Sequence, residues 1–208
     1  MARRTKEEAQ ATHDGILDAA EQLFVKQGVA RTTLQDIATV AGVTRGAIYW
    51  HFEDKGAMFN AMMERAKMPL ESAMQLLDTP DHAAPLDALC EAIMCVFRLT
   101  VDDPQARRVF EIATLKLEYV DEMSGVRERR KQNQAQWMVR AEALVRAAVA
   151  RGQARPQADP AAVALGLWAL IDGLLRAWLL APDAFDLVEM GRRVLDTHLG
   201  SLRLAPQG

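Results

Sequence analysis

The stretch that decides the fold is TTLQDIATVAGVTRGAIYWHF, residues 32–52. Apolar residues recur in it at helical spacing on both sides of Gly42, and a glycine at that point favours a tight turn. The pattern predicts two short helices, 34–40 and 45–50, joined at the turn.

Three polar residues mark where these helices begin. Thr33, with Asp36 three positions later, fits a capping box loosely, because aspartate stands in place of glutamate. Thr44 is the N-cap candidate of the second helix. The small side chains of Ala38 and Ala41 let the second helix cross the first closely. We therefore predict a helix-turn-helix.

The two faces of this motif differ in chemistry. Apolar side chains face the preceding helix, and they are Leu34, Ile37, Val43, Ile48 and Phe52. Polar and aromatic side chains remain on the outer face of the second helix, and they are Thr44, Arg45, Tyr49, Trp50 and His51. The second helix of such a motif enters the major groove of DNA, so we expect the outer face to bind DNA.

The outer residues have the chemistry that DNA requires. Thr44 lies at a helix N-terminus, where free amides and the helix dipole favour phosphate. Arg45 can bind guanine or phosphate through its planar fork. Tyr49 and His51 can donate hydrogen bonds to phosphate oxygens. For Tyr49 and Trp50, the alternative is a place in the hydrophobic core.

Four more cations extend the predicted DNA contacts. Lys55 begins the next helix and combines its charge with the amides of that helix. Arg3, Arg4 and Lys6 form a basic N-terminal arm that can reach the DNA backbone or a minor groove. The alternatives are an ordinary solvated charge for Lys55 and a tail without contacts for the arm.

Composition favours an all-α chain with only a local basic patch. The 208 residues include 35 Ala and 24 Leu against 15 Val and 6 Ile, which favours helices over strands. The chain has 25 Lys and Arg against 28 Asp and Glu, a net charge of −3. Acidic residues of the first helix, Asp14, Asp18 and Glu21, are expected to face away from DNA. We expect modest non-specific affinity, with specificity from direct contacts.

The remaining sequence predicts seven more helices and shows no strand pattern. Gly28 is a candidate stop for the first helix, and Asp54 is the candidate cap of the fourth. Pro69 lies inside the fourth helix and is expected to kink or break it. The nine predicted helices cover 7–27, 34–40, 45–50, 55–77, 85–101, 104–119, 127–152, 160–181 and 185–202.

The segment 161–181 is close to the length and apolarity of a membrane span. Its charged residues, Asp172 and Arg176, lie one turn apart near its middle, where each is costly in lipid. We therefore predict a buried helix and no membrane association. A helix this apolar in a chain of this size needs a partner to cover one face, which predicts a dimer.

The sequence predicts no enzyme active site, no cofactor and no metal site. It contains no GxSxG, P-loop, GxGxxG or HExxH motif. Its cysteines, Cys90 and Cys95, point to different faces of one helix, and we expect reduced thiols in a cytoplasmic protein. The N-terminal residues lack the apolar segment that is typical of a secretion signal.

The helix-turn-helix resembles the DNA-binding domain of the TetR family of repressors. Residues 33–38 and 41–55 carry the resemblance. Within the second stretch, the run GVTRGAIYWHF is especially similar to the AcrR and TtgR branch, which represses multidrug efflux pump genes. A looser similarity continues at 116–119, 172–174 and 178–182.

The resemblance implies an all-α, two-domain fold with nine helices. It implies a three-helix DNA-binding domain at residues 1–54 and a ligand-binding and dimerisation domain at 55–208. By position, Thr44 and Arg45 begin the recognition helix, and Thr33 binds phosphate at the N-terminus of the preceding helix. The last two helices pair with their copies in a four-helix bundle, which gives a homodimer that binds double-stranded operator DNA.

A ligand site is expected among the later helices. Apolar walls with few polar groups suit hydrophobic or aromatic small molecules. Asp172 is the main polar candidate, and its alternative is an i,i+4 salt bridge to Arg176. For the other residues the alternative is plain core packing. The candidate ligand-binding residues are Met74, Val96, Phe97, Phe110, Thr114, Trp137, Trp168, Asp172 and Trp178.

We therefore expect a ligand-responsive repressor that binds a palindromic operator and controls a multidrug efflux operon. In the expected mechanism, a hydrophobic ligand shifts the helix 55–77, which changes the separation of two recognition helices and weakens DNA binding. Two alternatives stay open. One is a regulator of another pathway, such as fatty-acid or amino-acid metabolism, and the other is a helical protein that binds a small ligand but not DNA.

Overall fold

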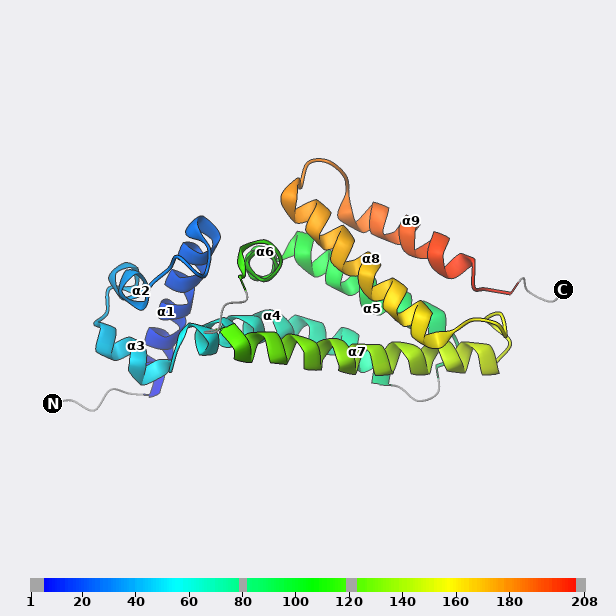
Figure 1. Cartoon of the computed structure of the whole chain (residues 1–208), viewed down its shortest axis with the longest axis horizontal. Coiled ribbons are helices and arrows are strands. Elements are labelled where there is room, and N and C mark those ends of the chain that lie inside the picture. The colour runs from blue at the N-terminus through cyan, green and yellow to red at the C-terminus, as the bar shows by residue number, and fades with distance from the viewer. Residues whose placement is uncertain (1–5, 79–81, 119–122, 205–208) are drawn as a thin grey trace. The chain divides into compact units, whose positions relative to one another are not determined.

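The computed structural model describes residues 6–78, 82–118 and 123–204, with the side chains of all of these except 66–76. Within these ranges the chain forms nine α-helices, one short π-helix and no strand (Figure 1). The predicted all-α fold is confirmed. The elements are α1 Lys6–Gln27, α2 Leu34–Ala41, α3 Arg45–His51, α4 Lys55–Asp78, α5 Pro85–Asp102, α6 Pro104–Glu111, η1 Ile112–Lys116 (the π-helix), α7 Ser124–Ala150, α8 Pro160–Leu180 and α9 Leu187–Gly200.

The chain divides into two compact units. The first unit is made of Met1–Ala66 and Gln105–Arg129, and the second of Lys67–Pro104 and Arg130–Gly208. This division does not follow the boundary expected at residue 55, because α4 contributes to both units and because α6 and η1 belong with the first three helices.

The first unit has its core where α1, α2 and α3 meet. Ile37, Ile48 and Phe52 are buried, as the helix-turn-helix pattern predicted. Leu34 and Val43 are partly buried and pack against the same core. The apolar face of the motif is therefore confirmed, and its burial fixes which side of α3 is left outside.

Caps and turns hold the ends of these helices as predicted. Gly28 and Gly42 have φ angles of 84° and 66°, which are left-handed values that glycine adopts without strain. The Thr33 hydroxyl accepts from the Asp36 amide at 3.1 Å, and the Asp36 carboxylate accepts from the Thr33 amide at 2.9 Å, which completes the capping box. Asp54 accepts from the amide three residues later at 2.7 Å.

Helix α4 continues through the proline that was expected to interrupt it. Pro69 does not break this helix, which is continuous from Lys55 to Asp78. A proline removes one backbone donor and crowds the carbonyl four residues earlier, a cost of about 3 kcal/mol. A helix of 24 residues keeps its hydrogen bonds on either side of that point.

The segment predicted as one helix over 104–119 changes its hydrogen-bond pattern partway. It is α-helical to Glu111 and π-helical over Ile112–Lys116. The π-helix packs against α1, and the Lys116 carbonyl accepts from the amide of Val29 at 3.3 Å. Apolar spacing in the sequence does not distinguish the two patterns, so this turn was not predicted.

The second unit packs α9 against α5 and α8 (Figure 1). Phe97 of α5 is fully buried against Gly191 of α9. A Cβ atom at Gly191 would lie 2.6 Å from a ring carbon of Phe97, so only glycine fits this approach.

Helix α8 is only partly covered within one chain. It is the one described helix that is long and apolar enough to cross a membrane, and 28% of its most apolar window is buried. Leu165 and Leu180 are 56% and 66% exposed. The expected burial of this helix is therefore not achieved by the single chain, because the described residues leave one apolar face uncovered.

Candidate nucleic-acid interface

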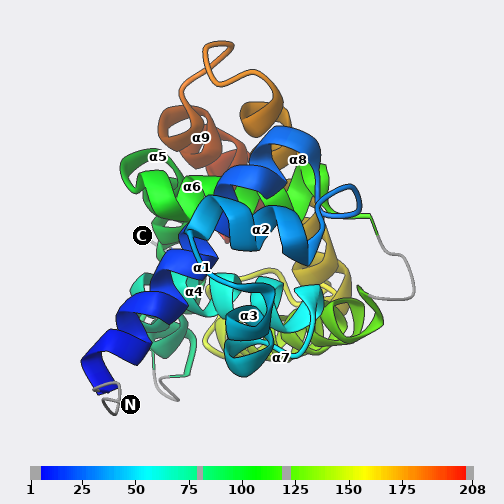
Figure 2. The same ribbon diagram turned by 90° about the vertical axis from the view of Figure 1, so that its left-hand side faces the viewer.

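The outer face of α3 is exposed as the sequence predicted. Figure 2 shows α1, α2 and α3 of the first unit, with α2 lying across α1. Ile48 points into the core, whereas Tyr49 and Trp50 are 50% and 73% exposed. A place in the core is therefore wrong for both aromatic side chains. Thr44 is the N-cap of α3, because its hydroxyl accepts from the Ala47 amide at 3.2 Å.

Arg45 and Tyr49 lie together on this face, one turn apart. A terminal nitrogen of Arg45 donates to the Tyr49 hydroxyl at 3.0 Å, and the guanidinium carbon lies 5.6 Å from the ring centroid. This contact orders a long side chain before any ligand arrives. Arg45 is exposed, so the other N–H groups of its guanidinium are available as donors for phosphate or guanine.

Thr33 is exposed at the N-terminus of α2, where a phosphate contact was predicted. Its hydroxyl donates to the Asp36 carboxylate at 2.7 Å. Hydrogen bonds from the Thr33 amide and hydroxyl hold the pKa of Asp36 below its usual value, so the carboxylate stays charged. An approaching phosphate would have to compete with this carboxylate for the donors at the helix end.

His51 and Lys55 are placed differently from the other predicted DNA contacts. The His51 ring is half-buried, with its centroid 5.8 Å from that of His13 and 4.5 Å from that of Trp50. Lys55 is 8% exposed, and its ammonium group donates to the carbonyl of Val29 at 3.3 Å. The solvated alternative for Lys55 is therefore wrong, and its phosphate contact stays a prediction. Its aliphatic stem adds to the core, and a carbonyl of the α1–α2 turn is one hydrogen-bond acceptor for its ammonium group.

Two of the three residues of the basic N-terminal arm, Arg3 and Arg4, lie outside the described residues. The third, Lys6, is the first residue that the structure describes, and it is exposed in the first turn of α1. The contacts expected of the arm stay a prediction.

An acidic stripe on α1 is bound by arginines from other helices. Arg65 of α4 contacts Asp18 at 2.7 Å, Asp14 at 3.0 Å and Glu21 at 3.5 Å. Glu21 is also 3.6 Å from Arg108 of α6. Burial raises the pKa of Glu21, and the two arginines oppose this shift. The stripe faces α4 and α6. Its spacing of four and then three residues places the three carboxylates on one face of α1, and this spacing can be read from the sequence.

Two contacts between α7 and α8 involve predicted ligand residues of the second unit. The rings of Trp137 and Trp168 lie 5.5 Å apart, between α7 and α8. Asp172 of α8 pairs with Arg130 of α7 at 3.0 Å. The proposed salt bridge from Asp172 to Arg176 is therefore wrong, because a helix packed alongside supplies the partner.

The remaining ligand-site candidates belong to both units. In the second unit, Phe97 and Trp178 are buried and Val96 is half-buried. Phe110 and Thr114 belong to α6 and η1 in the first unit. The side chain of Met74 lies outside the described residues. Phe97 packs against Gly191 of α9 and lies in the core, which was the alternative to a ligand contact.

Two protein-family models match the chain. "Bacterial regulatory proteins, tetR family" matches residues 16–62, and "MAATS-type transcriptional repressor, C-terminal region" matches residues 84–204. The first match includes α2 and α3 with the exposed face described above. The second includes α5 to α9.

Individual proteins match over nearly the whole chain. The HTH-type transcriptional regulator TtgR of Pseudomonas putida is 40% identical over 206 residues, which is 99% of this chain and 98% of TtgR. The structure of NalD, the secondary repressor of the MexAB-OprM multidrug efflux pump in Pseudomonas aeruginosa, is 32% identical, with a TM-score of 0.86 over 95% of this chain and 98% of NalD.

A complex with a small molecule is also similar. The structure of SmeT with triclosan has 34% identity and a TM-score of 0.82, over 95% of this chain and 94% of SmeT. SmeT is the repressor of the Stenotrophomonas maltophilia multidrug efflux pump SmeDEF. The similarity to all three proteins extends through both compact units.

Proposed function

The chain belongs to the TetR family of bacterial regulatory proteins, a family of transcriptional regulators and not of enzymes, and from this premise we propose that it is a ligand-responsive repressor of a multidrug efflux operon. NalD and SmeT, which are both similar to it across at least 94% of their own length, are repressors of such pumps. A repressor that acts on chromosomal DNA works in the cytoplasm.

The observation that carries the proposal is the exposed face of α3. Trp50 and Tyr49 are large aromatic side chains that are exposed on α3 and therefore available to a partner. Arg45 and Thr44 lie beside them at the helix N-terminus, the position from which recognition helices contact base edges. In the proposal these four residues bind the major groove, Thr33 binds a flanking phosphate, and Arg3 and Arg4 extend the contact along the backbone.

The uncovered face of α8 supports a homodimer. Leu165 and Leu180 are exposed on a helix with few charges, so a second copy that packs against α8 and α9 would remove this apolar surface from water. Two-fold symmetry then presents two copies of α3 to successive major grooves, which requires a palindromic operator.

Hydrophobic or aromatic effectors fit the contacts of the second unit. Trp137 and Trp168 offer aromatic surface, and the ion pair of Asp172 with Arg130 offers polar groups that are partly exposed. SmeT forms a complex with triclosan, an aromatic compound, so triclosan is the first effector to test. In the proposal the bound effector lowers the affinity for the operator.

The experiment measures operator binding and its release by fluorescence anisotropy. The probe is a labelled duplex from the DNA upstream of the protein's own gene, first delimited by footprinting. Arg45→Ala is expected to weaken binding by about 10- to 100-fold, the range for a lost bidentate base contact. Arg127→Gln is the matched control, because Arg127 is an exposed arginine of α7 in the same unit.

Effector release is tested on the same duplex. Triclosan is expected to lower the anisotropy of the wild-type complex, and Trp168→Ala is expected to require more triclosan without changing the affinity for DNA. If triclosan binds the protein and operator affinity stays the same, the effector part of the proposal is wrong. If Arg45→Ala and Arg127→Gln bind the duplex as the wild type does, the DNA-binding part is wrong.

A further inference from the structure

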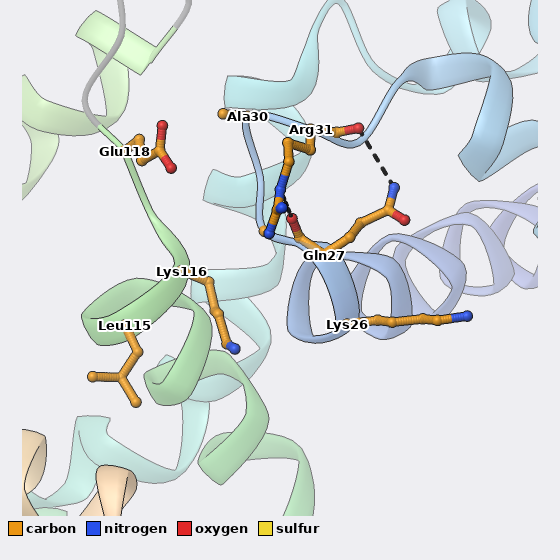
Figure 3. A pocket seen from close by; sticks show the side chains of 8 residues that line it. Lys26, Gln27, Ala30, Arg31, Leu115, Lys116 and Glu118 are labelled. Carbon is orange, nitrogen blue, oxygen red and sulfur yellow. Dashed lines mark hydrogen bonds between the residues drawn. The ribbon is translucent and has the colours of Figure 1, made fainter.

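A cavity in the first unit is lined by none of the residues proposed to bind DNA or the hydrophobic effector. It has a volume of about 120 Å³ and lies between the C-terminal end of α1, the turn that follows, and the end of η1 (Figure 3). Its lining includes Lys26 and Arg31 from the first segment and Lys116 and Glu118 from the second. The volume is well above the 10–15 Å³ or so that a single water needs, so a small polyatomic ion fits.

The charge around this cavity is positive. Three cations, Lys26, Arg31 and Lys116, stand against one carboxylate, Glu118, which leaves an excess of two positive charges. Among the described residues, no ion pair within 4.0 Å involves any of these four side chains.

Two of the cations face the cavity from opposite walls. In Figure 3, Arg31 lies on the wall formed by the turn after α1, Lys116 lies on the wall formed by η1, and Lys26 extends away from the cavity. The Arg31 Nε donates to the Gln27 carbonyl at 2.8 Å. This bond holds the plane of the guanidinium and leaves both terminal nitrogens as donors, which suits an oxyanion.

The walls of the cavity are fixed by hydrogen bonds before any ligand binds. The Gln27 side chain donates to the hydroxyl of Thr32 at 3.3 Å, and that hydroxyl donates to the carbonyl of Gly28 at 2.8 Å. The amide of Val29 donates to the carbonyl of Lys116 at 3.3 Å and joins the two walls. A preorganised site loses less entropy when a ligand binds.

We propose that this cavity binds the phosphate group of a small molecule or a free phosphate ion, held by Arg31 and Lys116. Phosphate carries about −1.5 to −2 charges at pH 7 and offers three acceptor oxygens, so it can accept from both the guanidinium of Arg31 and the ammonium of Lys116, whereas a carboxylate offers two oxygens and a single charge. The bound group fastens the turn between α1 and α2 to η1, and so joins the helix-turn-helix to the segment that continues α6. This ligand is separate from the hydrophobic effector proposed above.

The test is an NMR titration of the full-length, ¹⁵N-labelled protein in the absence of DNA. Inorganic phosphate, AMP and acetate are added separately at constant ionic strength, with chloride as the reference ion. Phosphate is expected to shift the amide signals of Gly28, Arg31 and Lys116 along a saturable curve, and acetate to bind at least about tenfold more weakly. Saturable binding of AMP at the same amides identifies an organic phosphate as a source, and binding of inorganic phosphate alone identifies the free ion.

Three variants separate this site from general charge effects. Arg31→Gln is expected to weaken phosphate binding by about tenfold or more, as the loss of a charge-assisted hydrogen bond implies. Glu118→Gln is expected to tighten it, an effect that a misfolded variant would not give. Arg127→Gln, which removes an exposed arginine elsewhere in the unit, is expected to leave it unchanged.

Some results would overturn the proposal. Shifts that grow linearly without saturation, equal binding by the wild type and Arg31→Gln, or acetate binding as tight as phosphate binding each contradict it. Shifts confined to α3 would assign the phosphate to the DNA-binding face instead. Because no operator is present, failure here leaves the proposed repressor function untouched.

Discussion

Replacing Arg65 by alanine removes the cation that three carboxylates of α1 share. The side chains of Asp14 and Asp18 are 43% and 61% exposed, and pairs at such exposure contribute about 0.2–1 kcal/mol each. Glu21 is 2% exposed, and breaking a buried pair costs about 3–5 kcal/mol when the remaining charge has no partner. Arg108 remains at 3.6 Å from Glu21, and protonation of Glu21 limits the loss. We therefore expect Arg65→Ala to lower the free energy of unfolding by about 2–3 kcal/mol.

The assay is urea denaturation followed by circular dichroism. Arg193→Ala is the matched control, because Arg193 pairs with Glu189 at 4.0 Å where both side chains are exposed, and it should cost less than about 0.5 kcal/mol. The decisive variant is Arg65→Ala with Glu21→Gln. Glutamine removes the buried charge that the first substitution leaves poorly paired, so the double variant should be more stable than Arg65→Ala alone. A double variant less stable than Arg65→Ala, or a loss below about 0.5 kcal/mol for Arg65→Ala, would refute the reasoning.

Further predictions concern packing, pH and one lysine. Gly191→Ala should destabilise the protein by about 1–2 kcal/mol in denaturation, because the overlap with the buried ring of Phe97 outweighs the gain in helix propensity. Gly15→Ala should stabilise it by up to about 1 kcal/mol, because nothing lies within 4 Å of the new methyl group. Burial raises the pKa of Glu21 above its ordinary value of 4.5, so its contribution to stability is fully present below that value and is lost as the pH rises through the folded pKa. Glu21→Gln should therefore gain stability relative to the wild type as the pH rises above 4.5, and a difference that does not change with pH would contradict this. Lys55→Met should lower the free energy of unfolding by about 1 kcal/mol, because the hydrogen bond to Val29 is lost. The salt dependence of operator binding should not change, and a slope of log affinity against log salt that falls by about one unit would instead indicate that Lys55 contacts a phosphate.

Local signals in the sequence predicted most of the helix-turn-helix. The pair Thr33 and Asp36, the glycines at 28 and 42, and Asp54 each act on backbone groups within a few residues, so their effect can be read without knowing the fold. The exposure of Trp50 could also be predicted, because helical spacing places it opposite Ile48.

Contacts between residues distant in sequence were the ones that sequence reasoning missed. Lys55 was expected to contact DNA or to be a solvated charge, since nothing near it in the chain indicates the hydrogen bond to the Val29 carbonyl 26 positions earlier. Asp172 was expected to bind the ligand, with a salt bridge to Arg176 on the same helix as the alternative, whereas its partner Arg130 is 42 residues away. In both cases the side chain contacts a residue that is distant in sequence and is brought near by the fold.

The π-helical turn at Ile112–Lys116 makes this part of the chain sensitive to its length. Each backbone hydrogen bond of a π-helix spans one residue more than that of an α-helix, and one residue of an α-helix corresponds to a rotation of about 100° around the helix axis. That extra residue sets the direction in which the Lys116 carbonyl meets the amide of Val29. Deleting a single residue here would restore α-helical phase and rotate the carbonyl away, so substitutions in the segment should be tolerated more readily than insertions or deletions.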